Sequence, residues 1–409
     1  MKKKLCLLSL AFILLVVACQ QDELPVSASE NNYISFAAPT LDVETSTRSH
    51  TQDALAPGDK FGVLGYCVPY ELGRPGIYNY NAGTSVWLNK YGLCPPSVFY
   101  NEPVTVGDTY CTYETPKQWY MPGKGLDGLD NAGVGSNAEQ YRYTFFAYYP
   151  YLEDPVFSID SPTDAATAGA PKFTFTMPHS GSDVDSPLDH NITPDAMFAV
   201  LFNRQKMQGS VTFTFSHMLT ALGFEVNNFS KYDLQVHSIK LRGQFFKQIV
   251  LDFTGSGTLG SYTFPDQYYR GTYTVYDETA HNGQPLSLPV PVDGEERSTS
   301  GLLPQNVDGT REHILLISGS APYFGPVSGD PASNSDVVHV SIDYTFDDGA
   351  TPARRTAVYG RPTTFTPTPG TKYTAQLNFV GNAFVLQFVV DNNETWEDGE
   401  SDNDDVIFE

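Results

Sequence analysis

The chain has 409 residues, 41% of them hydrophobic, and carries a formal charge of -23 from 47 acidic against 24 basic residues. Such an acidic chain argues against nucleic-acid binding, because contact with phosphates needs a basic face. Only 17% of the residues are charged, whereas Tyr (25), Phe (26), Gly (34) and Pro (29) are numerous, which favours short strands and tight turns over long helices. This length predicts two or three domains, and the composition excludes a disordered or collagen-like chain.

The first nineteen residues have the pattern of a bacterial export signal. Three lysines at 2–4 precede an apolar run over residues 5–17, which ends at Ala18-Cys19. The run is shorter than the roughly 20 residues that span a bilayer, so a cleaved signal peptide over residues 1–18 is predicted. The ending resembles the lipobox of bacterial lipoproteins, which implies that Cys19 carries a lipid such as palmitate. An ordinary signal peptide followed by a chance cysteine is the alternative.

Cysteine usage gives no metal or redox motif. After Cys6 and Cys19 are set aside, Cys67, Cys94 and Cys111 are left, which allows at most one disulfide. Their spacing matches neither a C-x-x-C pair nor a zinc pattern. Buried small thiols, with one bridge at most, are the expected arrangement.

The N-terminal half reads as a tether followed by strands and long loops. Residues 20–32 are polar and suit a tether, and a short strand is expected at 33–37. Residues 40–58 are polar, and residues 70–140 are rich in Gly, Pro, Tyr and Asn, which predicts long loops with a few short strands. Strands are expected at 60–66, 141–149, 172–177 and 211–215, and the last two alternate with a period of two.

The C-terminal half reads as strands spaced about ten residues apart. Residues 215–222 fit a helix or a strand, and a strand, a short turn and a second strand are predicted there. Turn sequences such as Asp293-Gly294, Asp348-Gly349 and Pro369-Gly370 separate the later segments. This spacing, without a long amphipathic helix, predicts an all-β fold of two packed antiparallel β-sandwich domains with a boundary near residues 205–210. The later strands are expected at 223–226, 234–242, 249–253, 271–276, 313–318, 337–346, 373–380 and 383–390.

The last nineteen residues form an acidic tail. They hold nine carboxylates and no Lys or Arg, which is typical of a solvated segment. Val406, Ile407 and Phe408 break this pattern and would suit a strand that pairs with another sheet. Alternate carboxylates over residues 398–404 could take calcium weakly, but the twelve-residue loop with its glycine is missing, so no metal site is predicted.

No catalytic motif is found. The G-x-G-x-x-G string at 123–128 lacks the strand and helix that a dinucleotide site needs, so it is interpreted as a loop. The eight histidines never occur four residues apart, and no catalytic residues and no cofactor are predicted, although a triad built from distant positions stays open. Exposed aromatic residues such as Trp87 and Trp119 could instead form a glycan platform.

Several local patterns together resemble the fimbrillin family of Bacteroidales, the subunits of lipoprotein-derived pili. The similarity extends over nearly the whole chain. It is carried by Cys19, Tyr33-Ile34-Ser35-Phe36, Ser46-Thr47-Arg48-Ser49, Gly58-Asp59-Lys60-Phe61-Gly62-Val63, the aromatic strand at 143–150, Asp195-Ala196-Met197-Phe198-Ala199, and residues 211–219.

The resemblance implies two transthyretin-like β-sandwich domains in tandem, export as a lipoprotein, proteolysis after an arginine, and polymerisation by strand exchange. Cleavage between Arg48 and Ser49 would release the strand at 33–37 and uncover the groove beneath it. An ordinary linker arginine is the alternative interpretation of Arg48. The expected organisation is a signal peptide (1–18), a lipidated segment with a removable strand (19–48), an N-terminal sandwich (49–207) and a C-terminal sandwich (208–409).

The function expected from these observations is structural and not enzymatic. The chain is predicted to be a shaft, tip or anchor subunit of a surface pilus at the outer membrane, with other pilus subunits as partners and Val406–Phe408 as the donor strand. The second hypothesis is a surface lipoprotein that binds glycan or host protein through residues 70–140 without polymerising. A secreted hydrolase is a third, more distant hypothesis.

Overall fold

The computed structural model describes most of the chain between residues 33 and 390. The described residues are 33–41, 55–69, 96–119, 141–151, 157–160, 169–204, 208–253, 260–292, 296–305, 312–318, 336–349, 353–360 and 367–390. Within these ranges, no helix has the length and apolar character required to cross a membrane.

The all-β prediction is confirmed. The described residues include two short 3-10 helices, η4 (His190–Ile192) and η6 (Glu278–His281). The strands, in chain order, are β1 (Thr40–Leu41), β2 (Lys60–Pro69), β3 (Phe99–Thr105), β4 (Tyr141–Tyr149), β5 (Phe157–Asp160), β6 (Lys172–Thr176), β7 (Pro187–Leu188), β8 (Met197–Arg204), β9 (Thr214–His217), β10 (Thr220–Asn228), β11 (Leu234–Phe246), β12 (Gln248–Asp252), β13 (Ser261–Thr263), β14 (Tyr268–Asp277), β15 (Leu286–Leu288), β16 (Ser298–Leu303), β17 (Ile314–Leu316), β18 (His339–Phe346), β19 (Arg355–Gly360), β20 (Lys372–Val380) and β21 (Ala383–Val390).

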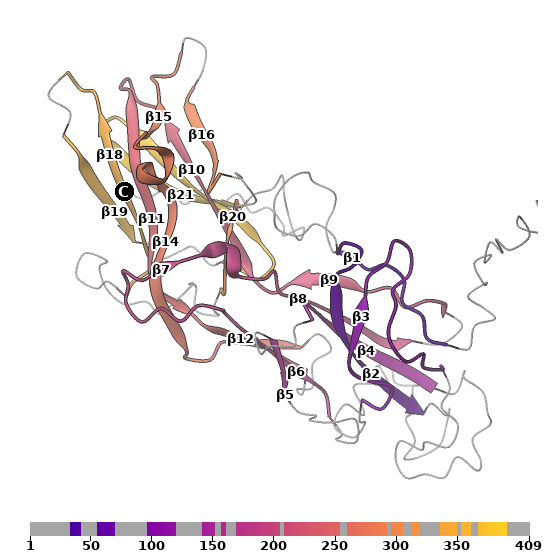
Figure 1. Ribbon diagram of the computed structural model, residues 1–409. Helices are drawn as coiled ribbons and strands as arrows, with labels where there is room; N and C mark the ends of the chain where they lie inside the picture. Colours follow the sequence, from indigo (N-terminus) through magenta and orange to yellow (C-terminus); the bar gives the residue numbers. More distant parts are fainter. Residues whose placement is uncertain are drawn as a thin grey trace, which may run out of the picture.

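The N-terminal strands form one six-stranded sheet in the order β1-β9-β8-β4-β2-β3 (Figure 1). Its inner strand β4 is buried on both faces: Phe145 and Phe146 are both fully buried, one on each side. A strand buried on both faces reads as a continuous aromatic run, which is the character of residues 143–149. This sheet is therefore an inner layer that needs a cover on each face.

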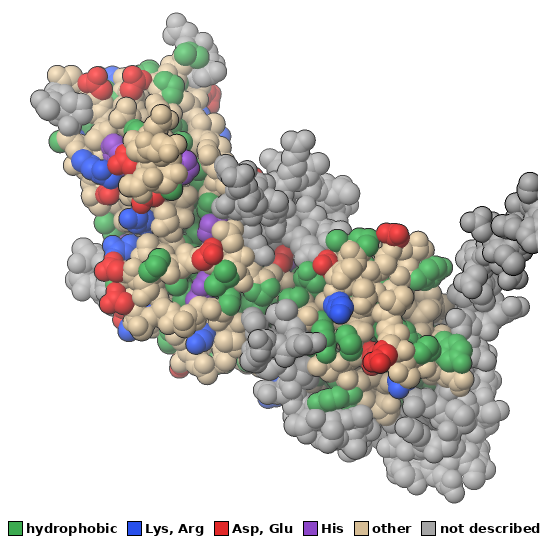
Figure 2. Space-filling view, viewed as in Figure 1, with side chains coloured by type: hydrophobic (Ala, Val, Ile, Leu, Met, Phe, Trp, Pro, Cys, Tyr) green, Lys and Arg blue, Asp and Glu red, His purple; other side chains and the backbone are tan. Residues whose placement is uncertain are grey.

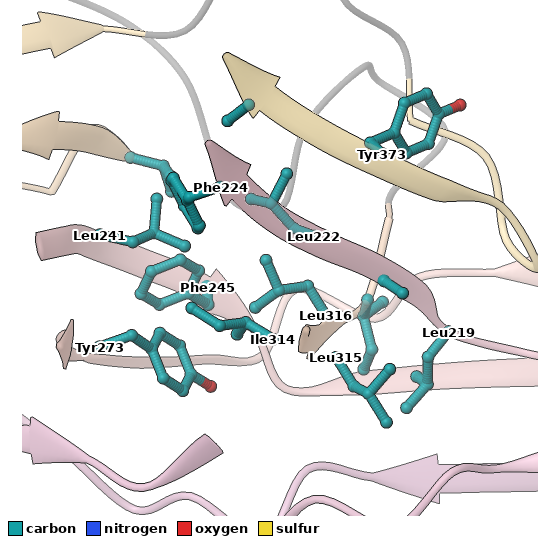
Figure 3. Close-up of a cluster of buried hydrophobic side chains, with 14 of the residues drawn as sticks. Leu219, Leu222, Phe224, Leu241, Phe245, Tyr273, Ile314, Leu315, Leu316 and Tyr373 are labelled. Carbon is teal, nitrogen blue, oxygen red and sulfur yellow. The ribbon is translucent and has the colours of Figure 1, made fainter. Parts of the chain in front are cut away.

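Two sheets face one another in the C-terminal region, in the order β16-β10-β20-β21 and β19-β18-β11-β14-β7. Figure 3 shows Leu222 and Phe224 of β10 pointing toward Leu241 and Phe245 of β11, with Tyr273 of β14 beside them. Most neighbouring strands are antiparallel, but β10 runs parallel to β20 over eight residue pairs. Short β17 and β15 pair with β10 and β11 at the margins of the two sheets.

A four-stranded sheet, β13-β12-β6-β5, draws strands from both sides of the predicted boundary at 207/208. In it, β6 and β12 pair from Lys172↔Asp252 to Thr176↔Gln248. The sheet covers the back of the N-terminal sheet, where the rings of Phe146 and Phe253 lie 4.8 Å apart. The described structure thus joins the two regions by a shared sheet, and the division into residues 49–207 and 208–409 stays a prediction.

The ambiguous segment at 215–222 is a strand, a two-residue break and a strand, as predicted. Here β9 ends at His217 and β10 begins at Thr220. Met218 and Leu219 of the break are fully buried, which explains why the segment carries no turn residues. Strand β9 of the N-terminal sheet is therefore followed after two residues by β10, an inner strand of the C-terminal sandwich.

Candidate functional site

A short segment from the start of the described chain lies beside strand β9 at the margin of the N-terminal sheet. Residues 33–41 run in extended form and end in β1, which pairs with β9. Ile34 and Phe36 are 2% and 0% exposed, whereas Tyr33 is 44% exposed. This alternation is the pattern predicted for a strand at 33–37, and it directs two apolar side chains into the core.

One edge of the segment is hydrogen-bonded to residues 211–215 in parallel orientation. Ala37 N donates to Val211 O at 3.0 Å, and Val211 N donates to Ser35 O at 2.8 Å. Further along, Thr40 N donates to Phe213 O at 2.9 Å, and β1 then pairs with β9. The segment therefore extends the six-stranded sheet beyond β9.

The other edge is hydrogen-bonded as well, to residues 109–117. Both edges of the strand are occupied, so the strand fills a slot between two walls and does not lie at a free margin. A strand in this position satisfies backbone groups on each side, and its removal would leave two rows unpaired. The bonds on this side are Ile34 N to Lys117 O at 2.7 Å, Ala38 N to Thr109 O at 3.0 Å and Cys111 N to Phe36 O at 2.8 Å.

Two side chains of this second wall bind the backbone of the strand. The Tyr113 hydroxyl donates to Ile34 O at 2.6 Å, and the Cys111 thiol donates to Ala37 O at 3.3 Å. Burial raises the pKa of both groups, so each keeps the proton that it donates. Both hydrogen bonds are made to backbone carbonyl oxygens and not to side chains. A strand of different sequence with the same backbone path would therefore accept them equally well.

The Phe36 ring fills an aromatic pocket. It stacks on Phe213 with centroids 5.6 Å apart and planes 18° apart. Edge or tilted contacts surround it on other sides, and aromatic pairs of this kind contribute about 0.5–1.5 kcal/mol each beyond their buried area. The further rings are Phe99 at 5.6 Å, Tyr113 at 5.6 Å, Phe145 at 6.1 Å and Phe61 at 6.5 Å.

The predicted site residues lie outside the described part of the chain; they are Cys19, Arg48, Ser49 and Val406–Phe408. The strand at 33–37 was predicted, but the second wall was missed, although the β-branched and aromatic residues of Thr109–Tyr113 are typical of a strand.

The predicted glycan platform loses one of its two tryptophans. Trp119 is 3% exposed and meets Tyr143 edge-on with ring centroids 5.1 Å apart. It belongs to the core around the slot and cannot stack on a sugar there. Trp87, the second tryptophan, lies outside the described residues, as does Cys94.

Two histidines outside the slot make hydrogen bonds in the interior of the described structure. His217 Nδ1 lies 2.9 Å from Asp195 Oδ1, and both side chains are buried. His179 Nε2 lies 3.0 Å from Thr193 Oγ1, and desolvation lowers the pKa of His179 to about 4. No group of His, Cys, Asp or Glu with metal-binding geometry occurs among the described residues. Acidic and basic side chains are interspersed on the face in Figure 2.

One family model matches more than half of the chain. Residues 137–391 match the family described as fimbrillin-like. A fimbrial protein from Bacteroides vulgatus shares the fold with a TM-score of 0.54 at 18% identity, over 90% of this chain and 100% of that one. The fimbrial anchor protein Mfa2 from Porphyromonas gingivalis aligns over 89% of this chain and 97% of its own at 10% identity and a TM-score of 0.30. No curated protein sequence matches this chain.

Proposed function

We propose, since this chain belongs to the fimbrillin-like family, that it is a structural subunit of a cell-surface pilus that contributes to adhesion. The family comprises structural proteins of fimbriae and not enzymes. In the proposal, the chain is exported as a lipoprotein through Cys19 and held at the outer membrane. It assembles by strand exchange after proteolysis near Arg48, as the shaft, the tip or the anchor of the pilus.

The two-walled slot is the observation that supports strand exchange. The strand is hydrogen-bonded on both edges, and its side chains Ile34 and Phe36 complete the hydrophobic core of the N-terminal sheet. Its loss would expose an aromatic pocket together with two rows of backbone donors and acceptors. An incoming strand would restore both, because strand addition supplies main-chain hydrogen bonds while alternate side chains fill pockets.

The position of Arg48 in the chain supports a cut there. It follows the slot strand, which ends at Leu41, and precedes Leu55, a buried residue of the same core. A cut between them would separate the strand covalently from the sheet while Leu55 stays in place. Before the cut, the strand is a covalently attached neighbour at high effective concentration, which favours the closed slot.

Cys111 offers a direct test. Its thiol lies 3.3 Å from Ala37 O and is 9% exposed. We expect the mature chain, cut after Arg48 by an arginine-specific protease, to react faster at Cys111 with a maleimide while it is monomeric, and to form polymers on a native gel as its concentration is raised. Peptide mapping distinguishes the label on Cys111 from labels on the other cysteines.

The Arg48→Ala variant is the matched control and should stay monomeric with slow labelling at Cys111. Persistent monomer after complete cleavage, with residues 33–41 released, would refute polymerisation. It would favour the second function, a surface lipoprotein that binds glycan or host protein without polymerising.

A further inference from the structure

We infer that Thr345 and Gln235, which are opposite each other on neighbouring strands of the C-terminal sandwich, form an intramolecular ester cross-link with His237 as the general base. The link joins Thr345 Oγ1 to the carboxamide carbon of Gln235 and releases ammonia. The inference goes beyond the proposed pilus role and does not depend on strand exchange, so its failure would leave that proposal standing.

The two linked residues lie on the outer face of the sheet, where β11 pairs with β18. Gln235 and Thr345 are direct cross-strand partners, and each stands between two buried residues of its own strand. The side chains of such a pair share one face, with Cβ atoms about 4.5–5.5 Å apart. The carboxamide carbon of a glutamine is two bonds beyond its Cβ, so it can reach the threonine hydroxyl.

A bulge in β11 brings His237 against the hydroxyl of Thr345. The pairing of β11 with β18 shifts between Val236 and Ser238, which makes His237 the extra residue. Its Nε2 lies 3.1 Å from Thr345 Oγ1. Bulges re-aim side chains in this way. The bulge thus places an imidazole and a hydroxyl within hydrogen-bond distance on the face that also carries the glutamine.

A carboxylate fixes which ring nitrogen of His237 carries the proton. Glu278 Oε2 lies 2.7 Å from His237 Nδ1, and Arg354 donates to Glu278 Oε1 at 3.0 Å. The hydrogen bond from His237 lowers the pKa of Glu278, so the carboxylate is ionised at neutral pH and can only accept. Nδ1 of the neutral ring therefore holds the proton, and Nε2 accepts the proton of Thr345. This arrangement turns a hydroxyl into a nucleophile.

The reaction balances without a co-reactant. His237 Nε2 takes the hydroxyl proton as Thr345 Oγ1 attacks the carboxamide carbon of Gln235 and the C–O bond forms. The C–N bond then breaks, and the leaving nitrogen takes the proton from Nε2 and departs as ammonia. The transfer happens once in each chain, so it is a self-modification and not enzymatic turnover.

The link would close a covalent loop within the C-terminal sandwich. It joins positions 110 residues apart, so the segment between them could not extend when the two ends of the chain are pulled. A cross-link over such a loop lowers the entropy of the unfolded chain. The midpoint of thermal unfolding should therefore lie on the order of 10 °C above that of an unlinked variant.

Mass spectrometry of the full chain tests the link directly. Trypsin releases Gln235 within residues 232–240 and Thr345 within residues 312–354. We expect these two peptides as one species, with the sum of their masses less about 17 Da for the ammonia lost. Mild alkali should separate them, because it hydrolyses the ester and leaves a glutamate at position 235. Two separate peptides at their unmodified masses, obtained from folded protein, would overturn the inference.

Substitutions identify the two ends of the link. Thr345→Val removes the hydroxyl and Gln235→Glu removes the leaving amine, so each should abolish the joined peptide, whereas Thr345→Ser should retain it. If Thr345→Val prevents folding, Gln235→Glu alone decides. Thr356→Val is the matched control, since that hydroxyl of the same sheet donates to Asp343 Oδ1 at 2.7 Å, and the link should survive it. A joined peptide that persists in Thr345→Val or in Gln235→Glu would overturn the assignment.

Two further variants test the base and the residue that positions it. His237→Ala should lower the linked fraction about tenfold or more, and added imidazole should restore it, which a purely structural role would not allow. Glu278→Gln should also lower the linked fraction, and the conservative Glu278→Asp should restore most of it. Complete linkage in His237→Ala without imidazole would overturn the role of His237 as the base.

Discussion

The strand at 33–41 and strand β21 complete their cores in opposite ways. β21 pairs with its sequence neighbour β20 over eight residue pairs from Tyr373↔Val390 to Val380↔Ala383, across a tight turn. The slot strand instead contacts partners far along the chain, as when Ser35 Oγ meets Ser210 Oγ at 2.8 Å across 175 residues. The difference teaches that two strands with similar apolar anchoring can be connected very differently: β21 follows its partner after a two-residue turn, whereas the slot strand is distant in sequence from every partner. Under the proposed mechanism, a cut near Arg48 would leave the slot strand held by noncovalent contacts alone.

The largest effect is expected from removing one buried phenylalanine ring in each of the two compared regions: Phe36 in the slot strand and Phe379 in β20, the partner of β21. Phe36→Ala and Phe379→Ala should each lower the free energy of unfolding by about 3–5 kcal/mol, because both rings are fully buried among other aromatic side chains. Urea unfolding measures the loss. After cleavage at Arg48, residues 33–41 should be released more completely from Phe36→Ala than from Phe379→Ala during gel filtration. A cost below about 1 kcal/mol for Phe36→Ala would contradict the anchor role, given the range for such truncations.

Acid should weaken the C-terminal sandwich. His313 is fully buried, neither ring nitrogen has a hydrogen-bond partner in the described structure, and desolvation and then Lys372 lower its pKa to about 3. Unfolding returns the pKa to its ordinary value near 6.5, so the unfolded state binds more protons below that pH. Above about pH 6.5, protonation of His313 does not change the free energy of unfolding. Below that pH the free energy of unfolding falls until the folded pKa is reached, by about 2 kcal/mol at pH 5.

The substitution His313→Leu isolates this contribution. The variant should lose less stability than the parent between pH 7 and pH 5 in thermal unfolding, because it no longer buries a group that protonates on unfolding. Equal acid sensitivity in both proteins would assign the effect to another group, such as His179.

A smaller effect concerns the clamp on the slot strand. Tyr113→Phe removes the 2.6 Å hydrogen bond to Ile34 O while keeping the ring that packs on Phe36. A loss of about 1 kcal/mol is expected, and the slot strand should leave about fivefold faster after cleavage. Stopped-flow displacement of a labelled 33–41 peptide measures the rate. An unchanged rate would show that the hydroxyl is not part of the clamp.

The smallest effect is expected where the slot strand meets solvent. Thr40 Oγ1 and Thr214 Oγ1 lie 3.2 Å apart in an exposed pair. Thr40→Ala should cost no more than about 0.5 kcal/mol, as for other exposed cross-strand pairs. The same urea titration serves as the measurement, and a larger cost would mean that the core around the slot extends to β1.

Sequence periodicity predicted the strands whose neighbours bury one face or both. β6, β20 and β21 lie where alternation placed them, and the aromatic run of β4 has the predicted bounds. Strand β19 was missed because Arg355–Gly360 has little apolar alternation. Its structure depends on six pairs with β18 and on the Tyr359 hydroxyl, which donates to Phe384 O at 2.9 Å. Such tertiary stabilisation leaves no local pattern.

Of the candidate site, the sequence predicted the slot strand but not the wall that flanks it. Ile34 and Phe36 predicted an inward-facing strand, but the wall at 109–117 lies some 75 residues later, in a region predicted to hold long loops with a few short strands that were not located. β3 was missed in the same region, since Pro103 and a left-handed Asn101 interrupt its pattern. Long-range pairing of this kind is set by the packed structure and not by neighbouring residues.

The four-stranded sheet has a consequence for the order of folding. Lys172 of β6 pairs with Asp252, which is synthesised 80 residues later, so β6 and β12 cannot pair before then. Until then the back of the N-terminal sheet, including Phe146, lacks the ring of Phe253 that covers it. A chain emerging N-terminus first would therefore present an aromatic surface during synthesis, when unpaired strands are prone to aggregate. The first sheet can complete its packing only after the later strands β12 and β13 have been made.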